Sequence, residues 1–481
     1  MGDSSILPRE ETLKALPPPP QATGSATKVK QLQDSGKLPI LVVLDDDPTG
    51  TQTCHGINVL TVWDQQTLTD EFNSTNSGFF ILTNSRALPT PQARDLIKEI
   101  CQAVKKAATS TGKEFEFVLR GDSTLRGHFP DEPEVAEEVV GKANGWILAP
   151  FFRQGGRLTI NDVHYVADGD KLVPAAQTPF ARDATFGYKN SHLAKYVEEK
   201  SKGRITSSEV GSISLDDIRS GGPAEVAKKL LKMNKKVIII NAVVDEDMEV
   251  FVLGMLEAAQ QGYRYIYRTG AAFVSTRLGI EQIQPLGPAD LDMDISSNAP
   301  GGLIIAGSYV PKTTAQLESL VQGRGEKLQT ITIDVEKLLE DPDHVRETTK
   351  TFAQDAANFI SRGEDVLLMT SRKLVTAEDE VSSLKIGSVV AQSLVDFMEL
   401  LEVRPRYVIA KGGITSSDAA SKSLRMRRAE IAGQAASGVP LWRCHEPTSK
   451  WAGIPYVVFP GNVGENHTLR DLVASWAKTA H

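Results

Sequence analysis

The chain has 481 residues, of which 41% are hydrophobic and 24% charged, and its formal net charge is −8. This length predicts two domains of roughly 200 residues, because single hydrophobic cores seldom grow larger. No basic stripe stands out, which disfavours nucleic acid and anionic membranes as partners, since both attract clustered Lys and Arg. The three cysteines lie far apart without metal-ligand spacing, and no apolar run is long enough to cross a bilayer. We therefore expect a soluble, cytoplasmic protein.

The chain opens with a polar segment that is too poor in apolar residues to build a core. Residues 1–36 contain a run of prolines from Pro17 to Pro20. We expect a disordered tail there, because little burial offsets the entropy lost on ordering. Order should begin at Leu38–Leu44, a continuous apolar run typical of a strand buried on both faces.

Similar apolar runs recur and alternate with amphipathic stretches. In the first half, strands are predicted at 78–82, 115–119, 146–149 and 237–241, and helices at 91–107 and 224–233. After a seam near 286–300, strands are predicted at 303–306, 328–333, 365–369, 407–410 and 456–459, with a helix at 385–402. The alternation predicts an α/β fold with two domains, 37–295 and 296–481, each a mostly parallel sheet flanked by helices.

Three aspartates, Asp45, Asp46 and Asp47, directly follow the first predicted strand. Open α/β sheets bind ligands at this end of their strands. Adjacent carboxylates repel one another, so stability alone does not explain the run. One carboxylate could take a proton from a substrate hydroxyl, and another could hold Mg²⁺ or hydroxyl groups. A solvated acidic turn that ends in Pro48 and Gly50 is the alternative.

Arginines follow the next predicted strands at equivalent ends. Arg86, Arg120 and Arg126 could form a fork for a carboxylate or a phosphate, since guanidinium binds such anions bidentately. Asp122 and Ser123 could hydrogen-bond substrate hydroxyls. Surface ion pairs are the plainer alternative for any one of these arginines.

A further predicted strand runs into a loop with two adjacent glycines, Gly155 and Gly156. Glycine permits close approach of the backbone to a ligand. Arg157 in this loop could add another anion contact. His164 is a weak candidate, because a lone histidine is more often a structural one.

The second half repeats one pattern of buried strand, small-residue loop and helix start. The pattern occurs at Gly307-Ser308, at Lys411-Gly412-Gly413 and from Gly461 to Gly464. Helix N-termini expose unpaired N–H groups, and glycine lets phosphate oxygens approach them, although ordinary helix caps look the same in sequence. Lys411 could supply a cation near a transferred phosphate. Neither GxxxxGK[ST] nor GxGxxG occurs, so spacing alone leaves the cofactor open.

These segments, in this order, resemble the four-carbon acid sugar kinase family, which includes 3-oxo-tetronate, D-threonate and D-erythronate kinases. The likeness rests on residues 45–53, 83–86, 122–127, 411–418 and 460–464. It implies an N-terminal substrate-binding domain, a C-terminal ATP-binding domain and an active site in the cleft between them. Arg120 and Gly121 stand where many relatives have a lysine and an apolar residue.

Together, the residues and the resemblance predict an ATP-dependent kinase that phosphorylates a hydroxyl of a four-carbon acid sugar, with Mg²⁺ as a cofactor and its ligands unassigned. The expected catalytic residues are Asp46, Asp45 and Arg126. The expected substrate contacts are Asp47, Arg86, Arg120, Asp122, Ser123 and Arg157. The expected nucleotide contacts are Ser308, Lys411, Gly412, Gly413, Gly461 and Gly464.

Two other functions stay open on the sequence. A lyase or a hydrolase could act on an acidic sugar through the same arginines and aspartates, without ATP. A non-catalytic sensor could bind the metabolite and the nucleotide as signals. The expected partner in each case is a small acidic sugar, and a homo-oligomer is compatible with the sequence.

Overall fold

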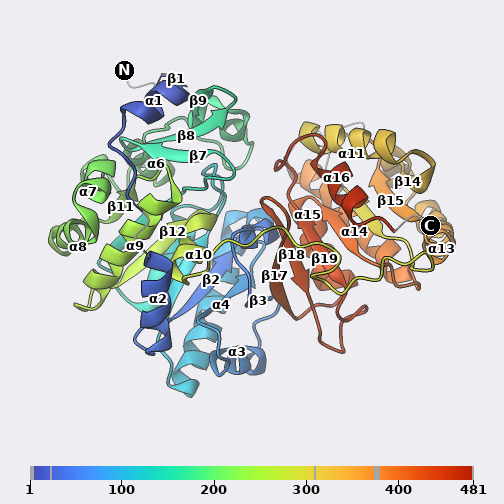
Figure 1. Ribbon diagram of the computed structural model, residues 1–481, viewed down its shortest axis with the longest axis horizontal. Helices are drawn as coiled ribbons and strands as arrows, with labels where there is room; N and C mark the ends of the chain where they lie inside the picture. The colour runs from blue at the N-terminus through green and yellow to red at the C-terminus, as the bar shows by residue number, and fades with distance from the viewer. Residues whose placement is uncertain (1–4, 22–23, 308–309, 373–379, 479–481) are drawn as a thin grey trace. The chain divides into compact units, whose positions relative to one another are not determined.

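The computed structural model describes residues 5–21, 24–307, 310–372 and 380–478 (Figure 1). The chain divides into two compact units, Met1–Gln282 and Ile283–His481. This division lies before the boundary expected at 295, because the connecting segment joins the second unit. Leu286 N donates to Gln434 O at 2.7 Å, and Leu291 is buried in the core of that unit.

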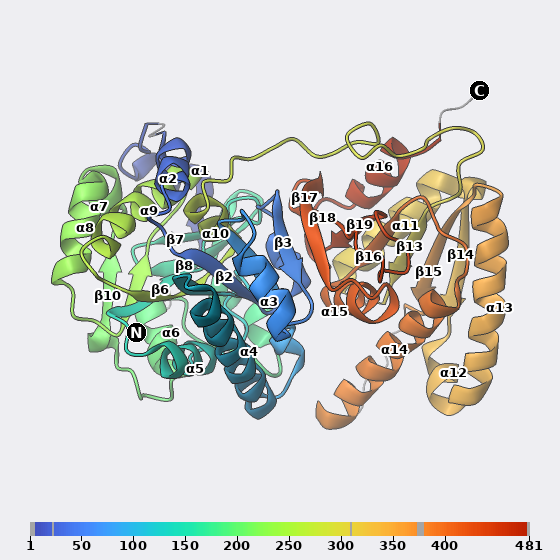
Figure 2. The same cartoon turned by 90° about the horizontal axis from the view of Figure 1, so that it is seen from below.

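Parallel strands form the main sheet of the first unit (Figure 2). Their order is β10-β11-β6-β12-β5-β2-β4-β3. Their bounds are β2 Ile40–Asp45, β3 Ile57–Leu60, β4 Gly78–Leu82, β5 Phe115–Arg120, β6 Gly145–Ala149, β10 Val210–Ile213, β11 Val237–Ile240 and β12 Tyr265–Thr269. Every residue of β4, β6, β11 and β12 is buried. Continuous apolar runs suit such strands, because helices cover both faces of a parallel sheet.

The direction of the chain along this sheet decides which face each helix covers. Along the sheet, the chain moves from β3 through β4 and β5 to β6 in one direction, and from β10 through β11 to β12 in the opposite direction. Because the crossovers are right-handed, the helices of the first series and those of the second lie on opposite faces of the sheet. The first face carries α3 Gln65–Phe72, α4 Thr90–Thr111 and α5 Asp131–Val140. The second carries α8 Gly222–Lys232 and α9 Asp245–Ala259, which packs on α7 Leu215–Arg219 and α10 Ala271–Arg277. The first unit also contains α6 Leu193–Lys200.

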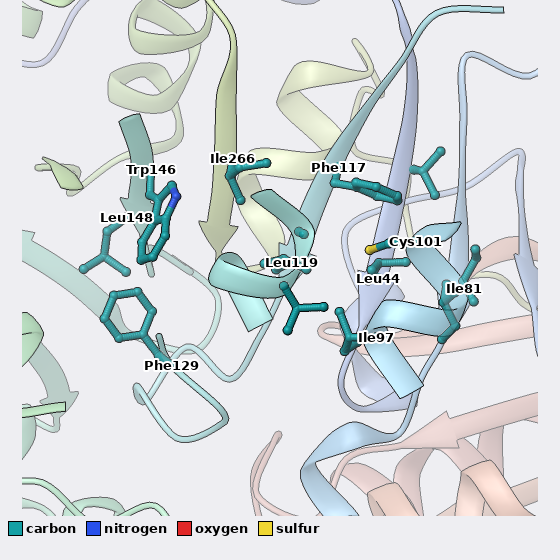
Figure 3. Packing of buried hydrophobic residues seen from close by; sticks show 14 of the residues in the cluster. Leu44, Ile81, Ile97, Cys101, Phe117, Leu119, Phe129, Trp146, Leu148 and Ile266 are labelled. Carbon is teal, nitrogen blue, oxygen red and sulfur yellow. The ribbon is translucent and has the colours of Figure 1, made fainter. Parts of the chain in front are cut away.

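The core of the first unit forms where α4 packs on the sheet. Its buried residues recur at helical spacing: Ala93, Ile97, Ile100, Cys101, Val104, Ala107 and Ala108. Figure 3 shows Ile97 and Cys101 of α4 beside Leu44 of β2 and Ile81 of β4. The helix ends at Gly112, whose φ of +66° is the left-handed conformation that glycine adopts without strain.

The connections diverge between the neighbouring strands β2 and β5. From β2 the chain continues toward β3 and β4, whereas from β5 it continues toward β6 on the other side. Such a divergence opens a crevice outside the carboxyl ends of the two strands, where α/β sheets bind their ligands. Asp45 and Arg120 are register partners at this edge. The fold thus brings two charged candidates from distant parts of the sequence to one place.

A small antiparallel sheet accompanies the main sheet of the first unit. Its strands are β1 Leu7–Pro8, β9 Lys171–Pro174, β8 Val163–Asp168 and β7 Arg157–Ile160, in that order. β1 comes from the segment that was expected to be a disordered tail, as do α1 Arg9–Ala15 and α2 Ser25–Asp34.

The described part of this segment is structured because it is anchored at separate points. Arg219 donates to Pro17 O at 2.5 Å. Helix α2 packs on α9 and α10, and Val29 is completely buried there. Burial and backbone pairing together offset the ordering entropy that the composition alone could not.

The second unit contains a mixed sheet in the order β17-β18-β19-β16-β13-β15-β14. The hairpin β17-β18 and the pair β18-β19 are antiparallel, and the other pairs are parallel. The strands are β13 Leu303–Ala306, β14 Leu328–Ile333, β15 Asp365–Thr370, β16 Val408–Lys411, β17 Arg428–Ala436, β18 Val439–Arg443 and β19 Pro455–Phe459. The helices are α11 Pro311–Arg324, α12 Val335–Glu340, α13 Pro342–Ser361, α14 Glu380–Leu400, α15 Gly413–Asp418 and α16 Thr468–Ser475.

The second sheet also has a point where its connections diverge, between β13 and β16. From β13 the chain steps toward β14, and from β14 and β15 it steps back, so right-handed crossovers put α11 and α14 on opposite faces. α15 packs beside α14, and α16 packs beside α11. The loops after β13 and β16 therefore leave toward different faces. Among the described residues, no helix is long and apolar enough to span a membrane.

Candidate functional site

Asp45 ends β2 and lies beneath the loop that follows it. Its side chain is completely buried, and its Oδ1 lies 3.3 Å from Arg120 Nη1. A Cβ on Gly50 would lie 2.1 Å from Asp45 Oδ2, so the loop can cover this carboxyl only with glycine at position 50. Burial raises the pKa of Asp45 to about 8, although Arg120 opposes the shift. Asp45 is therefore largely protonated near neutral pH.

Asp46 is surrounded by guanidinium groups but hydrogen-bonded to none of them. Its Oδ1 lies 3.9 Å from both Arg86 Nη2 and Arg120 Nη1, and its Oδ2 lies 3.7 Å from Arg268 Nη2. The side chain is 2% exposed. Neither carboxylate oxygen has a hydrogen-bond partner among the described residues. Buried polar atoms are nearly always paired, so this carboxylate has room for a hydrogen bond from a ligand.

Asp47 is the most exposed of the three adjacent aspartates. Its Oδ1 accepts from Thr49 N at 2.8 Å, and its Oδ2 pairs closely with Arg86. Burial opposes ionisation, but Arg86 and the Thr49 hydrogen bonds hold the pKa of Asp47 below its usual range. Arg86 Nη1 also lies 3.7 Å from Asp122 Oδ1. Arg86 thus links the loop after β2 to the loop after β5.

The loop after β5 presents Asp122 and Arg126 as a pair. Arg126 Nε donates to Asp122 Oδ2 at 2.7 Å. Despite burial, Arg126 and then Arg86 hold the pKa of Asp122 well below its usual range. Leu125 has φ +70°, a conformation that is costly for a non-glycine residue and needs support from its surroundings. The strained backbone at Leu125 is therefore part of what places the side chains of Asp122 and Arg126.

The support comes from side chains that tie the loop down through its carbonyl groups. Each carbonyl from residue 123 to 126 accepts a hydrogen bond from another part of the unit: Ser123 O from His164 Nε2 (2.7 Å), Thr124 O from Tyr188 OH (2.7 Å), Leu125 O from Tyr196 OH (2.8 Å) and Arg126 O from Arg268 Nη2 (3.1 Å). The loop is consequently fixed through its backbone carbonyls, and the paired side chains of Arg126 and Asp122 stay 24% and 12% exposed.

His164 serves this scaffold rather than the chemistry. Thr159 Oγ1 lies 3.0 Å from its Nδ1, and its Nε2 donates to Ser123 O. The ring is completely buried, and burial lowers its pKa to about 4. It is therefore neutral at physiological pH, as expected of a structural histidine. The Ser123 side chain is itself buried.

Arg157 and Arg126 share one aromatic neighbour. The Arg126 Cζ lies 5.4 Å from the centre of the Phe180 ring, and the Arg157 Cζ lies 5.6 Å from it. Arg157 also donates to Gly155 O, and burial lowers its pKa. Both guanidinium groups are therefore held near this ring by cation–π attraction.

Sequence reasoning missed two buried charges of this site, Arg268 and Glu132. Arg268 lies on β12, and the run Tyr265-Ile266-Tyr267 before it is a strand signal that could have revealed it. Glu132 lies in the first turn of α5, and Ser85 Oγ donates to its Oε1 at 2.5 Å. Burial raises the pKa of Glu132 to about 7, against the opposing charge of Arg268. Nothing in the acidic start of α5 marks Glu132 as buried.

In the second unit, Lys411 ends β16 with its ammonium group inside the protein. The side chain is completely buried, donates to Pro460 O and lies 4.3 Å from the centre of the Phe459 ring. Burial, reinforced by Lys312, lowers its pKa to about 7. Lys411 is thus placed to hold the loop after β19, and Gly412 beyond it has φ +112°.

The loop after β19 is tied down through its carbonyl groups, as the loop after β5 is. Gly461 O accepts from Thr313 Oγ1 at 3.1 Å. Gln316 Nε2 donates to Val463 O at 3.0 Å and to Glu465 O at 2.8 Å. Both donors lie on α11, so this helix sets the shape of the loop.

Glycines line the carboxyl end of the second sheet. Gly464 has φ +81°, and Gly413 begins α15. A Cβ on Gly307 would lie 2.7 Å from Leu394 Cδ1 and 3.0 Å from Thr415 Oγ1. Backbone can therefore approach closely at this edge. Ser308, a predicted nucleotide contact, lies outside the described residues.

The predicted residues accordingly fall into two groups, each within its own unit. Ion pairs join the charged candidates from Asp45 to Arg126 beside the carboxyl ends of β2 and β5. Arg157, at the start of β7, adjoins them through the Phe180 ring that it shares with Arg126. The candidates from Lys411 to Gly464 gather at the carboxyl ends of β16 and β19, which are register partners at Lys411 and Phe459.

Comparison with known proteins matches a described domain to each unit. Residues 41–277 match a family model described as a sugar-binding N-terminal domain, and residues 303–469 match one described as a nucleotide-binding C-terminal domain. A search of curated proteins found no match.

Two solved structures share the fold at low sequence identity. The Haemophilus influenzae protein HI1011 has 15% identity and a TM-score of 0.59, over 90% of this chain and 99% of that chain. A putative tRNA synthase from Salmonella typhimurium LT2 has 14% identity and a TM-score of 0.63, over 90% of this chain and 98% of that chain. With its sugar-binding and nucleotide-binding domains in this order, the chain belongs to the four-carbon acid sugar kinase family.

Proposed function

We propose that the protein is an ATP-dependent kinase that phosphorylates a hydroxyl group of a four-carbon acid sugar. One observation carries the proposal: Asp46 has two carboxylate oxygens without a hydrogen-bond partner among the described residues. It lies among Arg86, Arg120 and Arg268 at the divergence of β2 and β5. An acceptor of this kind suits the proton of a substrate hydroxyl.

In this proposal Asp46 orients the acceptor hydroxyl and takes its proton as the oxygen attacks. Asp45 is the weaker candidate for that role, because its carboxyl is largely protonated near neutral pH and is covered by Gly50. Arg86 and Arg120 face Asp46 without hydrogen-bonding to it, so they can stabilise charge that develops beside it. Asp47 and Asp122 are ionised and partly exposed, which suits them to other hydroxyls of the sugar.

The carboxylate of the acid would meet arginine. Arg126 keeps one edge on Asp122 and turns its face to Phe180, beside Arg157. Guanidinium groups bind carboxylates through paired hydrogen bonds. The combination of arginine at one end and carboxylates at the other favours a short polyhydroxy acid over a neutral sugar.

The nucleotide would lie on the glycine-lined edge of the second sheet. Gly412 and Gly464 have positive φ, and the carbonyls of the loop after β19 are already bonded to Lys411, Thr313 and Gln316. Such a loop keeps its shape while its backbone approaches phosphate oxygens. ATP supplies the phosphoryl group, and Mg²⁺ would neutralise its charge.

The magnesium ion would reach the protein on the phosphates. Among the described residues, no three His, Cys, Asp or Glu side chains are grouped to hold a metal by themselves. Mg²⁺ at phosphoryl-transfer sites usually takes only one or two carboxylates and completes its shell with phosphate and water. The carboxylates after β2 and β5 could supply one or two such ligands to a magnesium ion that is bound mainly by phosphate and water.

The deciding experiment measures ADP release from ATP and Mg²⁺ with a panel of threonate, erythronate and 3-oxo-tetronate stereoisomers. Release with one acid, together with the mass of a phosphorylated product, supports the kinase and names its substrate. Conversion of an acid without ATP would instead indicate a lyase or a hydrolase. Tight binding of acid and nucleotide without any product would indicate a sensor.

A further inference from the structure

One segment of the first unit, Thr178–Tyr188, lies directly against the arginines of the sugar-binding site. It contains the short helix Pro179–Arg182. Phe180 contacts the guanidinium groups of Arg126 and Arg157, and Tyr188 OH donates to the carbonyl of Thr124. The segment is therefore fixed to the loop after β5 at both of its ends.

Asp183, in the middle of this segment, presents a carboxylate to Arg126. Its Oδ1 accepts hydrogen bonds from Thr185 N at 3.0 Å and from Phe186 N at 2.9 Å. These bonds orient the carboxylate from the backbone, so that it does not depend on Arg126 for its position. Its Oδ2 lies 3.7 Å from Arg126 Nη1.

The two acidic partners of Arg126 differ in strength. The pair with Asp122 is a hydrogen bond of 2.7 Å, and the Asp122 side chain is 12% exposed. The pair with Asp183 is longer than a hydrogen bond, and its side chain is 28% exposed. A solvated pair at this distance contributes little free energy, so a better partner can replace it.

The free edge of Arg126 is also the edge that a ligand would use. Nε is engaged by Asp122, and the backbone carbonyl of Arg126 is engaged by Arg268. The Nη1 group remains beside Asp183, and the Arg126 side chain is 24% exposed. A carboxylate that arrives from solvent and hydrogen-bonds to Nη1 competes with the Asp183 carboxylate for this group.

We propose that Asp183 is an internal competitor of the ligand carboxylate at Arg126 and thereby sets how strongly the site discriminates acids from neutral sugars. This inference rests on the proposed function for the class of ligand. An acid that forms short, paired hydrogen bonds with the guanidinium gains more binding free energy than is lost when the weak pair with Asp183 is broken. A neutral polyol gains no such bond and leaves Asp183 in place. The competition lowers the affinity of the site for acids and leaves its affinity for neutral polyols unchanged.

The test compares wild type with Asp183→Asn by isothermal titration calorimetry, without nucleotide. Asparagine keeps the Oδ1 acceptor for Thr185 N and Phe186 N but loses the charge. The probes are D-threonate, D-erythronate and the neutral D-threitol. We expect the variant to bind the acid tighter by about two- to five-fold, as the loss of a weak pair implies, with threitol unchanged.

The matched control is Asp245→Asn. Asp245 is also 28% exposed and pairs with Arg153 at 3.3 Å, without contact with Arg126. The Asp245→Asn variant should bind the acid with the same affinity as wild type. Asp183→Ala removes the turn as well as the charge, and its Tm reports whether the segment stays folded.

Several results would overturn the proposal. The first is that Asp183→Asn binds the acid with the same affinity as wild type or with a lower one. The second is that the variant binds threitol more tightly by the same factor as the acid. The third is that neither wild type nor the variant binds any acid. The failure of the kinase proposal is a different result: acids bind, and tighter in the variant, but no ADP is released with any of them.

Discussion

Gly121 and Arg268 occupy adjoining space in which a larger residue at position 121 does not fit. A Cβ on Gly121 would lie 1.2 Å from Arg268 Nη1, and a Cβ on Gly127 would lie 2.5 Å from Nη2. The guanidinium thus fills the space between both ends of the loop after β5, donates to Arg126 O and faces Asp46. The absence of a side chain at position 121 therefore makes room for Arg268.

We predict that Gly121→Ala destabilises the first unit and weakens acid binding. The methyl group must displace a buried guanidinium that is held by Asp46 and by Arg126 O. Overpacking of this kind costs about 1–3 kcal/mol. Thermal unfolding and titration with D-threonate measure the two effects.

The control for this variant is Gly387→Ala. Gly387 lies on α14, and a Cβ added to it would meet no atom of the described residues within 4 Å, so alanine should be neutral or slightly stabilising there. Equal effects of the two substitutions would mean that Arg268 moves aside freely and does not position the loop.

Asp46→Asn should lower kcat by about 10²–10⁴-fold, the usual contribution of a general base, while nucleotide affinity stays unchanged. Asparagine matches the shape of the carboxylate but cannot accept the hydroxyl proton. The ADP-release assay and nucleotide titration separate the two quantities. An unchanged kcat would remove Asp46 from the mechanism.

Most strands of the two main sheets could be predicted because they are continuous apolar runs, but β3, β10, β12, β17 and β18 were not predicted. The runs at 78–82 and 303–306 coincide with β4 and β13. The small sheet β1-β9-β8-β7 was not predicted, because its strands are short and β1 pairs with β9, which is distant in sequence. The order in the N-terminal segment escaped prediction for the same reason: Val29 is buried only by contact with helices far along the chain.

Sequence position revealed the charged residues after β2 and β5 but not how they pair. That Asp45 is buried and Asp47 partly exposed depends on the loop folding over Gly50, which no local pattern encodes. Arg268 joins the group through the placement of β12 next to β5, a contact between distant segments. Lys411 follows the predicted strand, yet its ammonium points to Pro460 O inside the protein.

The ionisation of Glu132 should be visible in how the stability of the protein changes with pH. Its pKa rises from 4.5 to about 7 on folding, through burial. Between these values the folded state binds more protons than the unfolded state, so this group makes stability fall as pH rises through the window. Glu132→Gln keeps the acceptor for Ser85 Oγ and removes the titration.

The measurement is Tm from about pH 4.5 to about pH 7.5 for both proteins, which brackets the window between the unfolded and folded pKa values. The Tm of wild type should decline relative to that of Glu132→Gln as pH rises. Asp45 titrates in both proteins and cancels in the difference. A difference that stays constant with pH would show that Glu132 ionises normally.

Lys411→Met tests whether the buried ammonium supports the loop after β19. The variant leaves Pro460 O without its donor, which costs about 1–3 kcal/mol if the carbonyl stays buried. We expect lower Tm and an equal loss of affinity for ATP, ADP and AMP, because the loop itself loosens. Lys422→Met is the control, since Lys422 is 55% exposed and its ammonium pairs with the Asp418 carboxylate. A loss that grows with the number of phosphates would instead place the ammonium on the phosphates.

The N-terminal segment should contribute measurably to the stability of the first unit, although the matched family model begins at residue 41. Val29 is completely buried against α9 and α10, and Gln33 Nε2 donates to Arg277 O at 3.2 Å. Val29→Ala leaves a cavity and should cost about 1–2 kcal/mol, a little less than larger truncations in cores. Val321→Ala is the control, because Val321 lies on α11 with 38% of its side chain exposed. If the two substitutions shift Tm equally, α2 is not docked in solution; if only Val29→Ala does, the segment is part of the folded domain.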